Sequence, residues 1–221
     1  AAALTISKGI WCHRLTRDRF LLGGSLSNGG DVFRWVEKTF RLPEDAEAQI
    51  ATRAPGAHGL TMLPYLAGER SPYWRPDLRA AITGMTLSTT PLDVLQVALE
   101  SVSLRFRQIY DLLTEGFGPP AQVVASGGAL LSSPVWVQMM ADALDRPIVD
   151  CLEPEASSKG AAMIAAEQIG LLADLDSVPV AFGETVSPNA SHQEFYAQLM
   201  QRDRNLFDAL YGSPHAPLVN H

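Results

Sequence analysis

The stretch Val123-Val124-Ala125-Ser126-Gly127-Gly128-Ala129-Leu130-Leu131-Ser132-Ser133-Pro134 decides the fold of this chain. Its apolar start predicts a short buried strand that ends at two glycines. A helix is expected to begin a few residues later, with Ser133 as the N-cap and Pro134 as the first residue. A strand, a Gly-Gly turn and a helix let a ligand approach bare backbone near the positive end of a helix. An ordinary strand-to-helix turn has the same pattern, because short glycine motifs are weak signals.

Composition and charge limit the classes of protein to which the chain can belong. Its 221 residues suffice for one large or two small domains, and 47% hydrophobic residues can build a sizeable core. The net charge of −7 argues against a nucleic-acid partner, whose binding surface is normally basic, but leaves nucleotide binding open. No apolar run approaches the roughly 20 residues of a membrane span, so no membrane partner is expected. The order of expected elements is that of an α/β protein.

The cysteines and histidines suggest a reducing compartment and no metal centre. Cys12 and Cys151 are far apart and form no CxxC motif, which favours a cytoplasmic location. The five histidines are scattered without the spacing of metal ligands, so a histidine-based metal site is not expected. The start Ala1-Ala2-Ala3-Leu4-Thr5-Ile6 has no methionine and no basic region, and it has the pattern of a strand. We therefore expect a piece of a longer protein.

Two further stretches have the composition of functional loops. Residues 23–31 are rich in glycine and lead into an amphipathic segment, with Asn28 as its expected N-cap. They predict either a phosphate cradle or a helix start packed closely on a neighbour, and they lack a Walker pattern. Residues 67–77 mix aromatic residues, both charge signs and two prolines, which is typical of loops that carry function. The alternative for this loop is an Arg–Glu pair that merely holds it in order.

The other segments predict the remaining elements of one domain. Thr90, Pro91 and Asp93 form a T-x-x-D capping box, so a long helix is expected from there to residue 115. For Glu100 on this helix, the sequence leaves both a structural role and a role in a site open. Short strands are expected at residues 11–15, 20–22, 81–87 and 146–149, helices at 43–57, 157–166 and 192–211, and a loose connection at 171–190. The prediction is one domain over residues 1–212 and a flexible tail over 213–221.

Several of these stretches together resemble the C-terminal half of the FGGY carbohydrate kinases, most closely the gluconokinase-like or xylulokinase-like branches. Residues 24–35 resemble the gluconokinase pattern G-G-A-x-S-N-G-G-x-x-x-x-W, and residues 63–72 resemble L-P-x-L-x-G-E-R-x-P. Residues 80–100 follow a second family signature, with Val97 where Ala or Ser is usual. Ser126-Gly127-Gly128 and the helix after it, then Gly160-Ala161-Ala162, resemble the adenosine motif. The matches occur in the family's order, which is more specific than any single glycine pair.

The resemblance implies a fold, cofactors and a set of contacts. The fold is α/β, of the ribonuclease-H-like or actin-like ATPase type, and forms the C-terminal lobe of two lobes that close around ATP and a sugar. By motif, Gly127 and Gly128 approach the nucleotide, Ser132 lies near its base, and Gly30 and Arg34 line the same pocket. The implied reaction moves the γ-phosphoryl group of ATP, with Mg²⁺, to gluconate or, as the second choice, xylulose. Expected partners are the N-terminal lobe and the small substrate, and exposed helices could mediate a homodimer.

Two departures from the family pattern bear on activity. The G-T-S-G phosphate turn expected after Leu4-Thr5-Ile6 is replaced by Ser7-Lys8-Gly9-Ile10, and about a hairpin's length after it is missing. The family's catalytic aspartate would precede Ala1, so we assign no catalytic residue and no metal ligand in this chain. The 221-residue chain alone is expected to be inactive. The alternative, from another class, is a non-catalytic kinase-like module kept for association with a partner.

Overall fold

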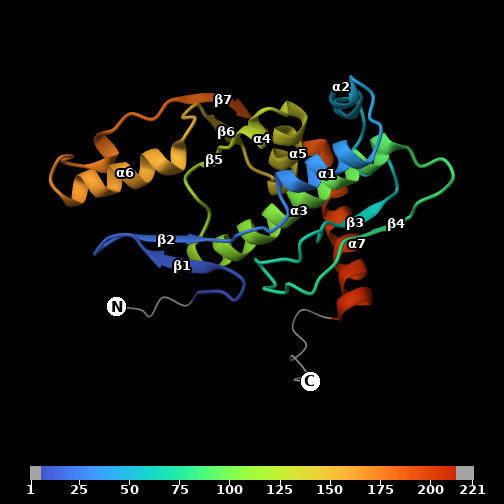
Figure 1. Ribbon diagram of the computed structural model, residues 1–221, viewed down its shortest axis with the longest axis horizontal. Coiled ribbons are helices and arrows are strands. Elements are labelled where there is room, and N and C mark those ends of the chain that lie inside the picture. Colours follow the sequence, from blue (N-terminus) through green and yellow to red (C-terminus); the bar gives the residue numbers. More distant parts are fainter. Residues whose placement is uncertain (1–5, 213–221) are drawn as a thin grey trace.

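A computed structural model describes residues 6–212 of the chain. The strand expected to end at Ile6 lies mostly on residues 1–5 and the tail after Gly212 lies on residues 213–221, both outside the described residues. Figure 1 shows a long central helix, α3, with the other helices and three small sheets around it. The strands are β1 (Trp11–Arg14), β2 (Phe20–Gly23), β3 (Thr61–Leu63), β4 (Ala81–Thr83), β5 (Val123–Ala125), β6 (Ile148–Cys151) and β7 (Phe182–Val186). The helices are α1 (Gly30–Thr39), α2 (Ala46–Ala51), α3 (Pro91–Phe117), α4 (Gly128–Leu131), α5 (Pro134–Leu144), α6 (Ala156–Gln168) and α7 (Gln193–Tyr211), with the 3₁₀ turns η1 (Leu175–Ser177) and η2 (Ala190–His192).

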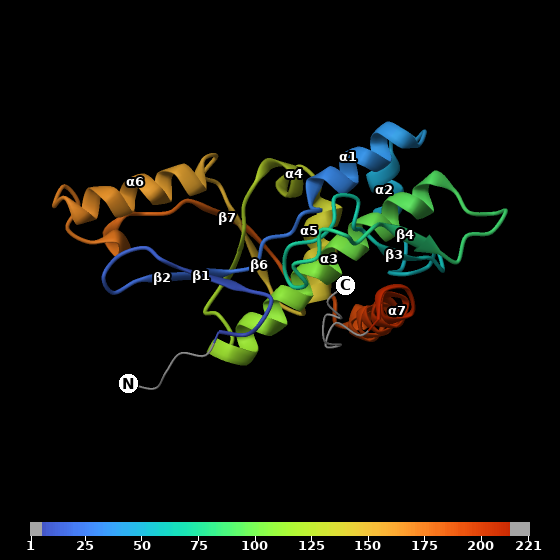
Figure 2. The same ribbon diagram turned by 60° about the horizontal axis from the view of Figure 1, so that its bottom comes forward.

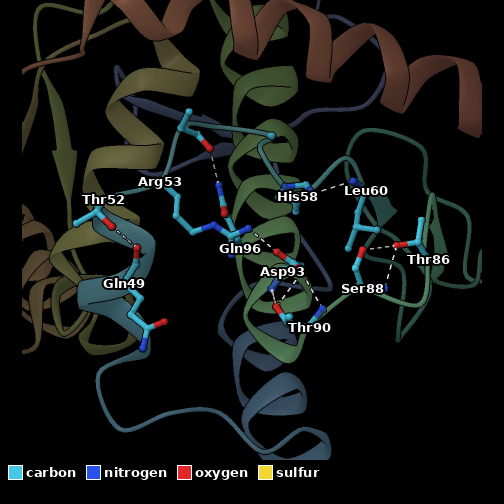
Figure 3. A network of polar contacts seen from close by, with 12 residues as sticks. Gln49, Thr52, Arg53, His58, Leu60, Thr86, Ser88, Thr90, Asp93 and Gln96 are labelled. Carbon is cyan, nitrogen blue, oxygen red and sulfur yellow. Dashed lines mark hydrogen bonds and ion pairs between the residues drawn. The ribbon is translucent and has the colours of Figure 1, made fainter.

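The long helix α3 begins where its sequence predicts. The Thr90 hydroxyl accepts a hydrogen bond from the N–H of Asp93, and the Asp93 carboxylate accepts one from the N–H of Thr90. Arg53 adds an ion pair to Asp93, and Figure 3 shows the three side chains together at the start of the helix. One turn further on, Gln96 donates to the carbonyl of Ala54 at 2.9 Å. The start of α3 is therefore fixed by its own capping box and by the segment that follows α2.

The main core lies between α3, α1 and α5. Apolar residues recur along α3 with helical spacing, and Val32, Val36 and Trp136 on the facing helices are at most 3% exposed. The ring of Phe33 on α1 stacks on Trp136 of α5, with centroids 6.3 Å apart. The buried members of this cluster are Val32, Val36, Ala46, Ile50, Leu60, Met62, Val94, Leu95, Val97, Ala98, Leu99, Val102, Trp136 and Met139. This packing fixes α1 against α5.

The third sheet carries the stretch from which the sequence analysis began. It pairs β5 with β6 in parallel and β6 with β7 in antiparallel orientation. Ala125 and Ile148 turn one face of this sheet onto α5, in a buried cluster with Val137, Met140, Ala141 and Leu144. Strand β7 corrects the expectation of a loose connection over residues 171–190. Its pattern is weak because Phe182 and Glu184 are exposed at the edge of the sheet, so only pairing with β6 defines the strand.

Other predicted elements are present with shifted bounds. The hairpin of β1 and β2 is confirmed, with Trp11 opposite Gly23. The strand expected over residues 81–87 is confined to β4, because Gly84 adopts a φ of +86° and ends the extended run. The helix expected at residues 43–57 is the six-residue α2 alone. The predicted helix at 192–211 is confirmed as α7.

The C-terminal helix α7 is held to α3 by a buried ion pair. Arg105 on α3 donates to Asp203 on α7, and their side chains are 0% and 1% exposed. Arg105 also donates to the hydroxyl of Tyr65 at 2.6 Å. Phe207 stacks on Tyr73 with centroids 4.4 Å apart and lies in a buried cluster with Tyr65. Figure 2 shows α7 alongside β3, so this helix is part of the same packed body.

Candidate functional site

No described heavy atom fills the space where side chains would project from the Gly127-Gly128 turn. Gly127 has a φ of +102°, so the backbone itself requires glycine there. Gly128 begins α4 and has no such requirement, because its φ lies outside the left-handed region. A Cβ built on Gly128 meets no described heavy atom within 4 Å, apart from its chain neighbours and its own helix. The described fold therefore has room for a side chain at residue 128.

The helix after the glycines begins earlier than the sequence predicts. The chain turns directly into the one-turn helix α4 at Gly128, and α5 begins at Pro134 as expected. Ser132 ends α4, where its N–H donates to the carbonyl of Gly128 at 2.9 Å. Ser133 is the N-cap of α5, but its buried Oγ has no hydrogen-bond partner among the described residues. The predicted cap is thus correct in position, and the hydrogen bond expected of it is not made.

The first turn of α1 carries the other two residues predicted for the site. Gly30 is the first residue of the helix, and a Cβ built on the preceding Gly29 meets no described heavy atom within 4 Å. Arg34 lies one turn further on with its side chain 74% exposed, and its guanidinium donates to Asp31. An exposed pair of this kind is weak, so the Arg34 side chain can change partners at little cost.

The fold brings these two glycine-rich elements together. Leu130 of α4 packs against the main core cluster, to which Val32 and Val36 of α1 belong. Figures 1 and 2 both show α4 beside α1. Gly30 and Arg34 therefore lie on the helix next to α4, which begins at Gly128 and is flanked by Gly127 and Ser132, although about 95 residues of sequence separate them.

The predicted cap of α1 is wrong. Gly29, not Asn28, is the N-cap residue. The Asn28 side chain is buried and bonds to another loop: it donates to the carbonyl of Gly68 at 2.5 Å and accepts from the N–H of Ala67 at 3.0 Å. An asparagine side chain can donate to a backbone carbonyl and accept from a backbone N–H of the same neighbouring segment, and these bonds compete with capping its own helix.

Residues 67–72 are bound along residues 25–28. The N–H of Ser25 donates to Ser71 Oγ at 3.0 Å, and the N–H of Ser71 donates back to the carbonyl of Ser25 at 2.9 Å. The carboxylate of Glu69 accepts from the N–H of Ser27 at 2.8 Å. We call residues 25–28 and 67–72 the paired loops. They form the support from which α1 begins.

The Arg–Glu pair considered for residues 67–77 is not what holds this loop. Glu69 Oε1 accepts from the backbone N–H of Arg70 at 2.9 Å, while the Arg70 guanidinium donates to the carbonyl of Leu26 at 2.7 Å. Both side chains bind backbone rather than each other. Burial raises the pKa of Glu69 above its ordinary value, and the N–H donors oppose this only in part. The loop is ordered, as that alternative held, but by a different set of bonds.

Two His–carboxylate pairs escaped the sequence analysis, and both have structural roles. His58 Nδ1 accepts from the N–H of Leu60 at 2.9 Å, so Nε2 carries the hydrogen and donates to Glu100 at 3.0 Å. Glu100 also accepts from the N–H of Gly56 at 2.9 Å, which settles its role as an anchor for residues 56–60. His192 similarly contacts Asp142 at 2.8 Å. No spacing in the sequence signals either pair, because the partners are 42 and 50 residues apart.

Within residues 6–212, no group of three or more His, Cys, Asp or Glu side chains could hold a metal ion. In the same part of the chain, no helix has the length and apolar character needed to cross a membrane.

Comparison with known proteins identifies the family. The model of the C-terminal domain of the FGGY family of carbohydrate kinases matches residues 6–169. The gluconokinase of Bacillus licheniformis is 36% identical over 223 residues, which covers 93% of this chain and 43% of that protein. Crystal structures of xylulose kinase and gluconate kinase from Lactobacillus acidophilus superpose with TM-scores of 0.80 and 0.79 at 28% and 27% identity, each covering 92% of this chain and 43% of theirs.

The fold and these similarities thus place the chain in the actin-like ATPase class. The chain belongs to the FGGY family of carbohydrate kinases and comprises its C-terminal domain. Gluconokinases and xylulose kinases are among its relatives, and the chain spans about 43% of their length.

Proposed function

We propose that this chain is the C-terminal nucleotide-binding lobe of an ATP-dependent carbohydrate kinase that phosphorylates gluconate, with xylulose as the second candidate. Similarity to a gluconokinase over 93% of the chain supports gluconate. The similarity to a xylulose kinase structure keeps xylulose as the alternative. The rest of such an enzyme would supply the N-terminal lobe, the catalytic aspartate and most contacts to the sugar.

The observation that carries this proposal is the open space over Gly128. Its backbone conformation and its surroundings among the described residues both tolerate a side chain. A bare backbone at this turn, next to the first turn of α1, would let the nucleotide approach closely. Gly127, Gly128 and Gly30 would lie against the nucleotide, and Ser132 near its base.

The residues of this chain would bind and orient the nucleotide. The N–H groups at the start of α1 that have no partner within the helix could donate to phosphate or ribose oxygens. Arg34, exposed and weakly paired with Asp31, could stack on the base or reach a phosphate. When bound, ATP supplies the γ-phosphoryl group and Mg²⁺ neutralises its charge. Mg²⁺ usually takes only one or two carboxylates besides substrate phosphates, so it would be held mainly by the phosphates and the other lobe.

The proposal extends to the domain and its setting. The nucleotide-binding domain would comprise residues 1–212, with 213–221 as a tail, so it includes α7 beyond the matched residues 6–169. The free thiols of Cys12 and Cys151 suit a cytoplasmic enzyme. A homodimer remains a prediction that light scattering of the complete protein would test.

The test is nucleotide binding to the complete protein that carries this sequence, with Gly128→Val as the variant. Calorimetry should detect ADP binding to the wild type. The variant should bind ADP at least about tenfold more weakly, because the valine side chain would occupy space that the nucleotide needs. Gly116→Val is the matched control: Gly116 lies in α3, and a Cβ there meets only Ser7 Oγ at 3.9 Å. The control should bind ADP like the wild type.

Four results would contradict parts of this proposal. No ADP binding by the wild type at millimolar ligand, or equal binding by Gly128→Val, would remove the nucleotide site. Phosphorylation of gluconate by the 221-residue chain alone would contradict the assignment of catalysis to the other lobe. A complete protein that binds ADP but phosphorylates neither gluconate nor xylulose would favour the non-catalytic module.

A further inference from the structure

We propose that Glu69 is a positioning residue of the nucleotide site: its Oε1 atom sets the backbone at Gly29 and Gly30, where α1 begins. This inference rests on the proposed function. It assigns a role to a carboxylate that lies in the paired loops and that forms no ion pair with an arginine among residues 6–212.

The geometry places Glu69 directly behind the start of α1. Glu69 is buried, with 2% of its surface exposed. Oε1 accepts from the N–H of Ser27 at 2.8 Å and from the N–H of Arg70 at 2.9 Å, so a single atom ties the two loops together. Ser27 precedes the N-cap Gly29 by two residues. A change in the reach of Oε1 therefore acts on the residues just before the first turn of α1.

The other oxygen of the carboxylate has no matching task. Glu69 Oε2 is buried and has no hydrogen-bond partner among the described residues. Burial raises the pKa of the group, which means that the ionised form is held at a cost in stability. A glutamine that placed its carbonyl oxygen at the Oε1 position would keep both hydrogen bonds and remove the buried charge. The two hydrogen bonds to Oε1 depend on the reach of Glu69, while the N–H donors and the attraction of Arg105 offset only part of the cost of burying its charge.

The expected consequence is on nucleotide affinity. A Cβ built on the N-cap Gly29 meets no described heavy atom within 4 Å, and the position of such open backbone sets how well it meets a ligand. Misplacing a binding group by about 1 Å can cost up to roughly a hundredfold in function. The sugar would be held mainly by the other lobe, so its binding should respond far less.

The experiment compares two substitutions in the complete protein, Glu69→Gln and Glu69→Asp. Glu69→Gln keeps the reach and loses the charge, whereas Glu69→Asp keeps the charge and draws the oxygens back by one methylene. We expect Glu69→Gln to bind ADP within about twofold of the wild type, and Glu69→Asp to bind about tenfold more weakly by calorimetry. The KM for gluconate should change less than about twofold in both.

Arg70→Met and Arg79→Met form a second, matched pair. Each arginine donates to backbone carbonyls, but Arg70 bonds to Leu26 in the paired loops, while Arg79 bonds to Pro76 and Leu78. Arg70→Met should weaken ADP binding about threefold, and Arg79→Met should leave it unchanged. Each arginine has at least one exposed bond, so these variants should fold and give a result even where Glu69→Asp does not fold.

The possible outcomes separate this inference from the proposed function. If the wild type binds no ADP, the proposed function fails and the inference fails with it. If the wild type binds ADP and a folded Glu69→Asp binds it equally well, only the positioning role is refuted. Weak binding by Glu69→Gln with normal binding by Glu69→Asp would also refute it, because charge would then be the property that matters. If Glu69→Asp does not fold, equal ADP binding by Arg70→Met and Arg79→Met refutes the role.

Discussion

The buried pair of Arg105 and Asp203 makes a quantitative prediction about how α7 is attached. Asp203→Ala leaves the Arg105 guanidinium, whose side chain is 0% exposed, without its counter-charge. Breaking a buried ion pair in this way costs about 3–5 kcal/mol. A typical domain has about 5–15 kcal/mol of total stability, so the variant should be close to unfolding or should release α7.

Removing both charges should cost less than removing one. In Arg105→Met combined with Asp203→Leu, no charge stays buried, and the unpartnered atoms Arg105 Nε and Asp203 Oδ1 disappear with the pair. What remains is the hydroxyl of Tyr65, 0% exposed, which loses the hydrogen bond from Arg105 at 2.6 Å. An unsatisfied buried hydroxyl costs about 1–3 kcal/mol, and adding Tyr65→Phe should recover most of it.

Urea unfolding at constant pH measures these differences. Asp111→Ala is the matched control, because Asp111 pairs with Arg107 on the same helix with side chains 44% and 35% exposed. Pairs of this exposed i, i+4 kind are worth about 0.3–0.5 kcal/mol. The reasoning is refuted if Asp203→Ala costs less than about 1 kcal/mol, or if the double variant is no more stable than Asp203→Ala.

Two further predictions concern stability elsewhere. Partial burial acts to raise the pKa of Asp93, but the bonds from Arg53 and Thr90 outweigh it and lower the pKa below the usual 3.8. Asp93 therefore stabilises the fold above pH 3.8 and loses this effect as the pH falls through its lowered pKa. In acid, the melting temperature of the wild type should drop towards that of Asp93→Asn. Parallel curves of melting temperature against pH for the two proteins would contradict this. Gly160→Ala, in the interior of α6 with nothing within 4 Å of the new Cβ, should stabilise by about 0.5–1 kcal/mol in urea unfolding. Gly68→Ala should destabilise by at least about 1 kcal/mol, because its φ is +69° and its Cβ would lie 2.6 Å from a backbone oxygen; equal effects of the two alanines would refute the argument.

Local signals in the sequence predicted those elements whose ends are encoded locally. The capping box of Thr90 and Asp93 predicted the start of α3, and the glycine pair at 127–128 predicted the end of β5. Such signals work because capping and turn formation depend on residues within a few positions of one another. Strand β7 was missed because an exposed edge strand shows no apolar alternation, and its identity comes from pairing with β6.

For the candidate site too, the sequence predicted some features and missed others that depend on distant contacts. The sequence predicted its five residues by motif, and their roles toward a nucleotide remain a proposal. Asn28 shows where local reasoning fails: as a single residue before a helix it has the properties of a cap, but the neighbouring loop offers a carbonyl and an N–H that compete for its amide. The same loop gives Glu69 its bonds to Ser27 and Arg70. No spacing along the chain indicates that these two loops lie side by side.

By itself, the sequence determined the α/β class, the family and the order of the glycine-rich motifs, because motifs and short-range periodicity are written in consecutive residues. Only the tertiary structure decided that α1 and α4 lie side by side, that Glu69 binds backbone and not arginine, and that α7 is fixed by Arg105 and Asp203. These are contacts between residues about 40 to 100 positions apart, and they depend on which surfaces the packed core brings together.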